Sequence, residues 1–290
     1  MNDPRHEPRI AAFDSLFPDL LAEFTAANEA YLNGTPRGAL SGIPKLDREL
    51  GGAFQPGVHI LHAGSGAGKT ALAGQMAARA GCPALYISAE MGLLELARRH
   101  IARETETYLG RLKTGELSPP AAMELARQTA AALPDLALVD ATLSPAYPTW
   151  IKDRAEAIRG RSPHLLIVID SIHSWAESFP TNEGGSEYDT LNYALKSLRD
   201  LAAALACPVL GIAERNRGSR EKGGIAASAG SRKFEYGAET VLSLERKDDV
   251  QPDANGEVPV TLKLEKNRNG AAGRSVPLKF HGALQRFTEG

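Results

Sequence analysis

The hydrophobic and polar positions along the chain change period several times, and each change marks an expected element. Between Phe13 and Leu32 apolar residues recur at helical spacing, and Asn33-Gly34 ends the pattern. Short continuous apolar runs then alternate with helical patterns from residue 58 to residue 213. Continuous apolar strands separated by helices are typical of a parallel sheet that is covered on both faces.

The expected elements follow one another in a regular order. Core strands are expected at 58–63, 84–89, 136–139, 165–169 and 209–213. Helices are expected after the first of these strands and at 93–103, 119–132, 149–158 and 188–206. The C-terminal part differs, because turn residues separate short runs at 240–244, 258–265 and 275–280. The pattern predicts an α/β fold with a mainly parallel central sheet and a C-terminal antiparallel strand extension.

Composition divides the chain into three parts. Residues 1–10 are polar and contain proline, which is typical of a flexible tail. Residues 11–42 hold the first helical pattern and a linker with glycine and proline, and residues 43–290 hold the alternating elements. The N-terminal helix would pack on its own domain or dock on a neighbouring subunit, and its periodicity does not distinguish the two.

Bulk composition restricts the class of protein. The chain has 290 residues, of which 43% are hydrophobic and 23% charged, as in an ordinary globular protein. A formal net charge of −2 excludes a strongly basic protein, so any contact with nucleic acid must come from a local basic patch. No apolar run is long enough to span a membrane, so we expect a cytoplasmic protein without membrane contact. Cys82 and Cys207 each precede a proline and an apolar run, and we expect buried thiols.

The turn after the first core strand is the clearest candidate for chemistry. From Ala63 to Thr70 it reads Ala-Gly-Ser-Gly-Ala-Gly-Lys-Thr, with Ala63 in place of the usual first glycine. An apolar strand, a glycine-rich turn and a helix form the context of a phosphate-binding P-loop. Lys69 would add a positive charge, and Thr70 a hydroxyl ligand for Mg²⁺. The predicted ATP-binding residues are Gly64, Ser65, Gly66, Ala67, Gly68, Lys69 and Thr70.

Two carboxylates follow predicted strands. Asp170 ends a continuous apolar run, where a P-loop fold needs an acid near Thr70 to hold the water shell of Mg²⁺. Glu90 follows another strand and could orient or activate the water that attacks the γ-phosphate. The alternatives are structural: Asp170 would cap the following turn, and Glu90 would cap the next helix.

A glycine-rich stretch between Glu214 and Glu235 carries six basic residues against three acidic ones. Flexible Lys and Arg side chains with backbone N–H groups suit a track for nucleic-acid phosphates, and long loops in compact domains are usually functional or disordered. The alternative is a solvated mobile loop. The predicted nucleic-acid-binding residues are Arg215, Arg217, Arg220, Lys222, Arg232 and Lys233.

Two further cations follow a predicted strand near the C-terminus. Lys266 and Arg268 lie in the segment Lys-Asn-Arg-Asn-Gly. They could stabilise the charge of a γ-phosphate in the transition state, as arginine fingers do. The alternative is an exposed hairpin turn with ordinary surface charge, which composition alone favours.

In this order, these stretches resemble the RecA-like ATPase domain of DnaB-type hexameric replicative helicases, over about residues 27–287. The segment Ser-Ala-Glu90-Met is similar to the Ser-Leu-Glu-Met motif of the family, which implies that Glu90 is catalytic beside Lys69. Ala-Glu214-Arg-Asn-Arg is similar to its Ser-Gln-Leu-Asn-Arg segment, which implies a γ-phosphate sensor at Glu214. The C-terminal segment is similar to its Lys-x-Arg-Asn-Gly, which implies that Lys266 and Arg268 act in trans on the ATP of a neighbouring subunit.

The sequence also departs from the family. Glu214 stands where the family has Gln, and a carboxylate there would repel phosphate unless it were protonated or paired, for example with Arg215 or Arg217. Ala229-Gly230 stand in place of an Arg-Glu pair that helps to hold DNA, and we expect no N-terminal helical collar domain. These departures do not change the prediction of ATPase activity. They leave open whether the protein separates nucleic-acid strands.

The resemblance implies an ATP-hydrolysing helicase or translocase on single-stranded DNA, with ATP and Mg²⁺ bound at subunit interfaces. It implies a homo-oligomer, expected as a hexameric ring, and a loader or another replication protein as a further partner. The alternative is a RecA/KaiC-like ATPase that acts as a switch or loader on a protein partner without separating strands.

Overall fold

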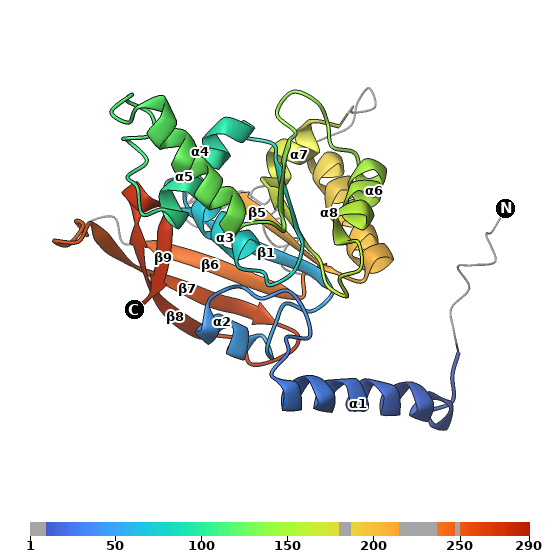
Figure 1. Ribbon diagram of the computed structural model, residues 1–290. Coiled ribbons are helices and arrows are strands. Elements are labelled where there is room, and N and C mark those ends of the chain that lie inside the picture. Colours follow the sequence, from blue (N-terminus) through green and yellow to red (C-terminus); the bar gives the residue numbers. More distant parts are fainter. Residues whose placement is uncertain (1–9, 180–186, 215–236, 247–249) are drawn as a thin grey trace, which may run out of the picture. The chain divides into compact units, whose positions relative to one another are not determined.

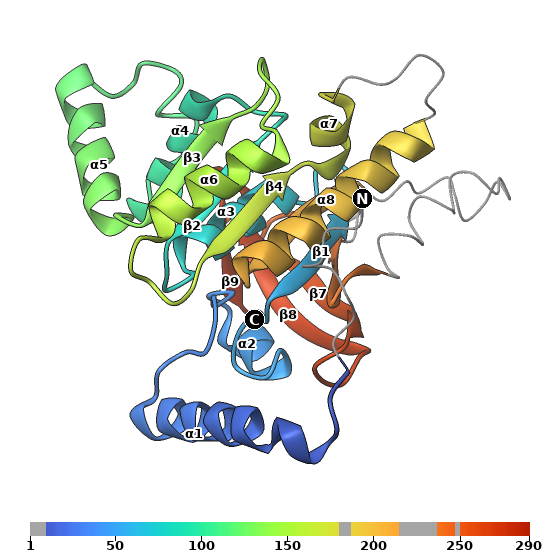
Figure 2. The ribbon, with the colours of Figure 1, turned by 90° about the vertical axis from the view of Figure 1, so that its right-hand side faces the viewer.

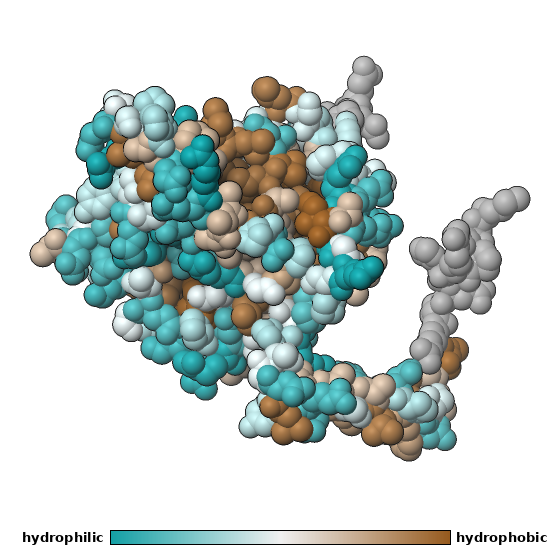
Figure 3. Space-filling model, viewed as in Figure 1, coloured by the Kyte–Doolittle hydropathy of each residue, from teal (hydrophilic) through white to brown (hydrophobic). Residues whose placement is uncertain are grey.

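The chain divides after Arg37 into two units, Met1–Arg37 and Gly38–Gly290. The computed structural model describes residues 10–179, 187–214, 237–246 and 250–290. In the first unit a 3₁₀ turn at Asp14–Leu16 leads into helix α1 (Phe17–Asn33), which Gly34 ends with a φ of 63°. Several large apolar side chains of α1 are more than half exposed, among them Phe17, Leu21 and Phe24, and brown patches mark this helix in Figure 3.

The second unit alternates helices and strands (Figure 1). Its helices are α2 (Pro44–Glu49), α3 (Lys69–Ala78), α4 (Leu93–Glu104), α5 (Pro119–Ala132), α6 (Pro148–Arg159), α7 (Ile172–Glu177) and α8 (Glu187–Leu205). Its strands are β1 (Gly57–Ala63), β2 (Ala84–Ser88), β3 (Leu136–Asp140), β4 (Leu166–Asp170), β5 (Pro208–Glu214), β6 (Thr240–Arg246), β7 (Glu257–Asn267), β8 (Arg274–His281) and β9 (Arg286–Glu289). A 3₁₀ turn at Gly282–Leu284 joins the last two strands.

The strands form one nine-stranded sheet in the order β3-β2-β4-β5-β1-β6-β7-β8-β9. The pairs from β3 to β6 are parallel, and the pairs from β6 to β9 are antiparallel. The predicted α/β fold is thus confirmed. Strand β6, which the sequence pattern groups with the C-terminal strands, pairs in parallel with β1, so the antiparallel extension begins at β7.

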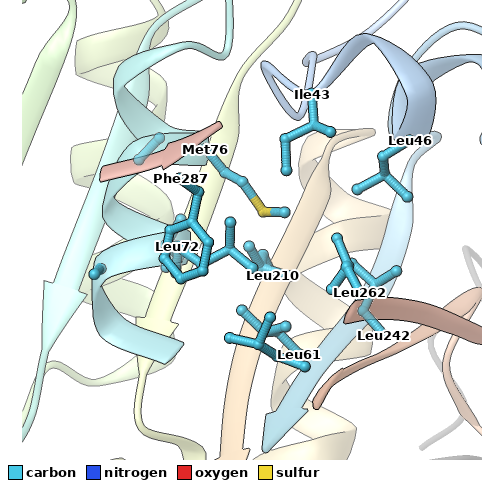
Figure 4. Close-up of a cluster of buried hydrophobic side chains, with 14 of the residues drawn as sticks. Ile43, Leu46, Leu61, Leu72, Met76, Leu210, Leu242, Leu262 and Phe287 are labelled. Carbon is cyan, nitrogen blue, oxygen red and sulfur yellow. The ribbon is translucent and has the colours of Figure 1, made fainter. Parts of the chain in front are cut away.

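Helices cover both faces of the sheet (Figure 2), and a hydrophobic cluster fills each side. Alternate residues of β1 point to opposite faces, so Val58 and Ile60 pack with α6, α7 and α8 whereas Leu61 packs with α3. Figure 4 shows the cluster that contains Leu61, in which Leu72 and Met76 of α3 lie against the sheet. Both are fully buried, and burial of such a side chain contributes about 1.5–3 kcal/mol.

The sequence pattern does not predict two short elements, α7 and β9. Helix α7 follows β4 directly, and its six residues are too few to show a helical period. Strand β9 has four residues, and its Phe287 ring stacks on Phe280 of β8 at a centroid distance of 4.4 Å.

The two free thiols are buried as expected, and burial raises the pKa of both Cys82 and Cys207 to about 11. Within the described ranges, no helix combines the length and apolarity that a membrane span needs.

Candidate active site

The predicted P-loop connects the carboxyl end of β1 to α3. Gly66 and Gly68 have φ angles of 73° and 97°, which side-chain-bearing residues rarely adopt. A Cβ on Gly68 would lie 3.0 Å from Cζ of Phe287, whereas a Cβ on Gly66 would meet nothing within 4 Å. Glycine at position 68 therefore lets the loop pack on the Phe280–Phe287 ring stack, and Gly66 borders open space.

Lys69 is the first residue of α3 and folds back over the loop. Its Nζ donates to the carbonyl oxygens of Ala63 at 3.1 Å and Gly64 at 3.2 Å. Glu214 Oε1 lies 3.7 Å from the same Nζ, because Ala63 and Glu214 are register partners at the ends of β1 and β5. The described charged partner of the Glu214 carboxylate is therefore Lys69. The proposed partners Arg215 and Arg217 lie outside the described residues.

Asp170 ends β4 and is 2% exposed. The hydroxyl of Tyr86 donates to its Oδ2 at 2.6 Å, and the side chain of Thr70 is a second hydrogen-bond partner. Burial raises the pKa of Asp170, and the charge of Glu90 raises it further. The hydrogen bonds with Tyr86 and Thr70 and the charge of Lys69 lower this pKa, but the net shift is upward. A buried carboxylate beside a threonine hydroxyl fits a divalent cation, since the cation would compensate the charge that burial disfavours.

Glu90 follows β2 and is exposed. Its Oε1 accepts hydrogen bonds from the hydroxyls of Ser171 and, at 3.1 Å, Ser174. Ser88 and Asp170 are register partners, so Glu90 and Asp170 emerge from neighbouring strand ends. Neither structural alternative matches the helix caps: Gly92 caps α4 without a side-chain bond, and Ser171 caps α7.

Arg268 lies at the other end of the parallel strands from the P-loop. Asn267 pairs with Thr240, and Thr240 pairs with His59 near the start of β1, whereas Lys266 pairs with Val241, which is level with Ile60 in the middle of β1. The six-residue step from Gly57 to Ala63 corresponds to roughly 20 Å of strand, so Arg268 and the P-loop of the same subunit are far apart. Arg268 Nη1 lies 3.0 Å from Glu239 Oε1.

The structure thus gathers Lys69, Thr70, Glu90, Asp170 and Glu214 at the carboxyl ends of β1, β2, β4 and β5. The other P-loop residues, 64–68, lie at the same end of β1, and the remaining predicted residues do not join this group. The six basic residues proposed for nucleic acid all fall outside the described ranges; they are Arg215, Arg217, Arg220, Lys222, Arg232 and Lys233. In the described part of the chain, no three His, Cys, Asp or Glu side chains form a metal-binding group.

Sequence reasoning missed the partners of the two carboxylates. Tyr86 contributes the only aromatic hydroxyl in the apolar run of β2, and it lies two residues before Ser88, on the same face of the strand. Ser171 and Ser174 follow Asp170 within one turn. A polar residue inside an apolar strand, and hydroxyls directly after the strand-end acid, are the signals that could have identified them.

The fold and the strand-end site define a RecA-like P-loop protein. Residues 38–289 match the family model of the DnaB-like helicase C terminal domain, and the chain belongs to this family.

Individual relatives agree with this membership. The chain is 25% identical over 275 residues to the replicative DNA helicase DnaB of Leifsonia xyli, which covers 89% of this chain and 57% of that protein. It therefore spans little more than half the length of this relative. The solved structure of a DnaB-like replicative helicase, described with its interactions with primase, superposes with a TM-score of 0.76 at 17% identity, over 98% of this chain and 68% of the other. A KaiC-like protein from Pyrococcus horikoshii shares the fold with a TM-score of 0.59 at 19% identity, over 88% and 99% of the two chains.

Proposed function

We propose that this chain is the motor of an ATP-hydrolysing DnaB-like helicase or translocase that acts on single-stranded DNA. One observation supports this most strongly. In a chain of the DnaB-like helicase C-terminal family, Lys69, Thr70, Glu90 and Asp170 converge at the carboxyl ends of parallel strands β1, β2 and β4 of one sheet. Phosphoryl transfer from ATP needs these groups: a cation on the phosphates, a hydroxyl and carboxylate for Mg²⁺, and a carboxylate for the attacking water.

Each residue would have a distinct role. Backbone N–H groups of the P-loop and the N-terminus of α3 would bind the phosphates, and Lys69 would leave its carbonyl partners to contact them. Thr70 and Asp170 would hold Mg²⁺, which supplies positive charge to the β- and γ-phosphates. Glu90, held by Ser171 and Ser174, would orient the water and accept its proton.

The separation of the two halves of the site supports a head-to-tail oligomer. Because Arg268 lies at the opposite end of β1 from the P-loop, it would act, together with Lys266, on ATP bound to the neighbouring copy. Head-to-tail contacts close into rings when the rotation allows it, and we propose a hexameric ring. The exposed apolar side chains of α1 would dock on the adjacent subunit.

Single-stranded DNA would contact the basic residues between 215 and 233, and a loader or another replication protein would be a further partner. The test is ATP hydrolysis with and without single-stranded DNA at low and moderate salt, with a Lys69→Ala preparation as the control for contaminating ATPase. We expect stimulation by DNA that fades as salt rises, because phosphate contacts release counterions. Hydrolysis that is indifferent to DNA at low salt would contradict the proposal.

A second candidate function is a RecA/KaiC-like switch or loader that acts on a protein partner. One observation favours it: Glu214, at the position proposed for the γ-phosphate sensor, carries a negative charge 3.7 Å from Lys69. Hydrolysis that is independent of DNA but stimulated by a protein partner would favour this candidate.

A further inference from the structure

Glu239 contacts Arg268, the arginine proposed to act in trans, through both its side chain and its backbone. Arg268 Nη1 lies 3.0 Å from Glu239 Oε1, and the Arg268 backbone N–H donates to the Glu239 carbonyl oxygen at 2.9 Å. Both the main chain and the guanidinium of Arg268 are therefore fastened to Glu239, the residue immediately before β6.

The backbone of Glu239 is itself held by the start of β1, and its side chain packs there. The Glu239 N–H donates to the carbonyl oxygen of Val58 at 2.7 Å. Gly57 has a φ of 136°, and a Cβ at this position would lie only 2.4 Å from Cγ of Glu239. Glycine at position 57 thus leaves room for the Glu239 side chain, which lies across the beginning of the strand.

The pair borders an open pocket at the amino end of β1. Its lining includes Pro56, Gly57, Arg199, Glu239 and Arg268. The Glu239 side chain is 24% exposed, whereas the Arg268 side chain is 52% exposed. A largely covered carboxylate therefore orients a guanidinium that faces solvent. A second guanidinium, that of Arg199, lines the same pocket, which suits an anionic group brought by another molecule.

We infer that Glu239 is a positioning residue, which holds the Arg268 guanidinium in the orientation that meets the γ-phosphate of ATP in the neighbouring subunit. This inference rests on the proposed trans role of Arg268. A long arginine side chain loses rotamer freedom when it binds phosphate, and prior orientation lowers that loss at the moment of reaction. Glu239 acts only through Arg268 and has no contact with the P-loop of its own subunit.

The first test is steady-state ATP hydrolysis by the full-length Glu239→Ala protein. We expect kcat to fall roughly three- to tenfold with an unchanged KM for ATP, because a half-exposed ion pair fixes geometry at modest strength. Glu239→Gln keeps an accepting oxygen and should restore most of the rate, which also keeps the test valid if the alanine variant folds poorly. The matched control is Glu257→Gln, which removes the Glu257–Lys279 pair elsewhere in the C-terminal strands and should leave the rate unchanged.

Two further arms separate positioning from a structural role. Glu239→Ala in an Arg268→Ala background should add no further loss, and an additive loss would overturn the inference. Co-assembly of Glu239→Ala with Lys69→Ala subunits should raise turnover per intact P-loop above that of Glu239→Ala alone, because Lys69→Ala subunits supply a correctly held Arg268. No recovery would place the defect in the mutated subunit itself and overturn the inference.

The same experiments distinguish failure of the positioning role of Glu239 from failure of the trans role of Arg268. If Arg268→Ala lowers turnover and is rescued in trans while Glu239→Ala behaves as wild type, the inference fails and the proposed function stands. If Arg268→Ala leaves turnover unchanged, the trans role fails and the inference fails with it.

Discussion

The two ends of β1 carry opposite chemistry. At the carboxyl end, the P-loop lies beside Asp170 and Glu90, and the Asp170 carboxylate is 2% exposed with a tyrosine donor at 2.6 Å. At the amino end, Arg268 is about half exposed and is held by Glu239. One end is thus built to hold a ligand within the domain, and the other presents a cation outward.

This difference explains why a single subunit would be an incomplete enzyme. The residues that would bind ATP and Mg²⁺ share the ends of parallel strands, where strand register alone brings them together. Arg268, which would stabilise transferred charge, directly follows β7 and lies near the amino end of β1, roughly 20 Å of strand from the P-loop. A second copy, stacked head to tail, would bring the outward cation to the P-loop.

The largest effect should come from Glu90→Gln, which removes the proposed base and keeps the shape of the side chain. We expect kcat to fall by about 10²- to 10⁴-fold, the typical contribution of a positioned base, with ATP binding preserved. Equilibrium binding of ATP beside single-turnover hydrolysis measures the two separately. Glu124→Gln on α5, an exposed carboxylate far from the strand ends, is the control. Unchanged turnover in Glu90→Gln would remove Glu90 from the mechanism.

Asp170→Asn should slow hydrolysis, by less than Glu90→Gln, and yet stabilise the metal-free protein. Burial raises the pKa of Asp170, so the charged form is disfavoured in the native state at neutral pH. The neutral variant should therefore be more stable at pH 7 by roughly 0.5–2 kcal/mol, as at other functional sites. As pH falls through the raised folded pKa toward 3.8, wild-type Asp170 takes up a proton and the gap should close. Urea unfolding at several pH values checks this, and a variant less stable than wild type at pH 7 would contradict it.

Tyr86→Phe tests the donor that the sequence did not reveal. The variant leaves Asp170 Oδ2 without its 2.6 Å partner, so the free energy of unfolding should fall by about 1–2 kcal/mol. The Mg²⁺ concentration for half-maximal hydrolysis should rise severalfold, because a donor that orients the carboxylate is lost. Tyr193→Phe removes an exposed hydroxyl and serves as the control. Identical Mg²⁺ dependence in wild type and Tyr86→Phe would show that Tyr86 does not position Asp170.

The smallest effect is expected from Glu214→Gln. Glu214 is more than half exposed and lies 3.7 Å from Lys69 Nζ, where its charge would compete with a phosphate. The KM for ATP should fall roughly two- to fivefold, since such exposed pairs are weak. The same Glu257→Gln control applies. A higher KM would mean that Glu214 helps ATP binding by ordering Lys69.

The sequence predicts the carboxyl end of β1 well because its signals are local. A glycine-rich turn between an apolar run and a helical pattern identifies the P-loop, and a carboxylate after an apolar run identifies Asp170. The sequence does not predict the parallel pairing of β6, because a short apolar run does not reveal whether the strand runs parallel or antiparallel to its neighbour. Helix α7 and strand β9 are too short for any period.

The contacts that fix the site residues depend on register between distant strands. Tyr86 meets Asp170 only because β2 and β4 pair with Ser88 opposite Asp170. Glu239 meets Arg268 only because β6 and β7 pair with Thr240 opposite Asn267. Neither pair has a local sequence signal, since 84 residues separate Tyr86 from Asp170 and 29 separate Glu239 from Arg268.

The claim that a complete site needs both ends of the strand, from two copies, is tested most directly by mixing Arg268→Ala with Lys69→Ala subunits under conditions that allow exchange. Each variant alone should be nearly inactive. In an equal random mixture about a quarter of the head-to-tail interfaces would join an intact P-loop to an intact Arg268. The account predicts recovery of ATP hydrolysis toward that fraction. A mixture that exchanges subunits but stays as inactive as its components would contradict it.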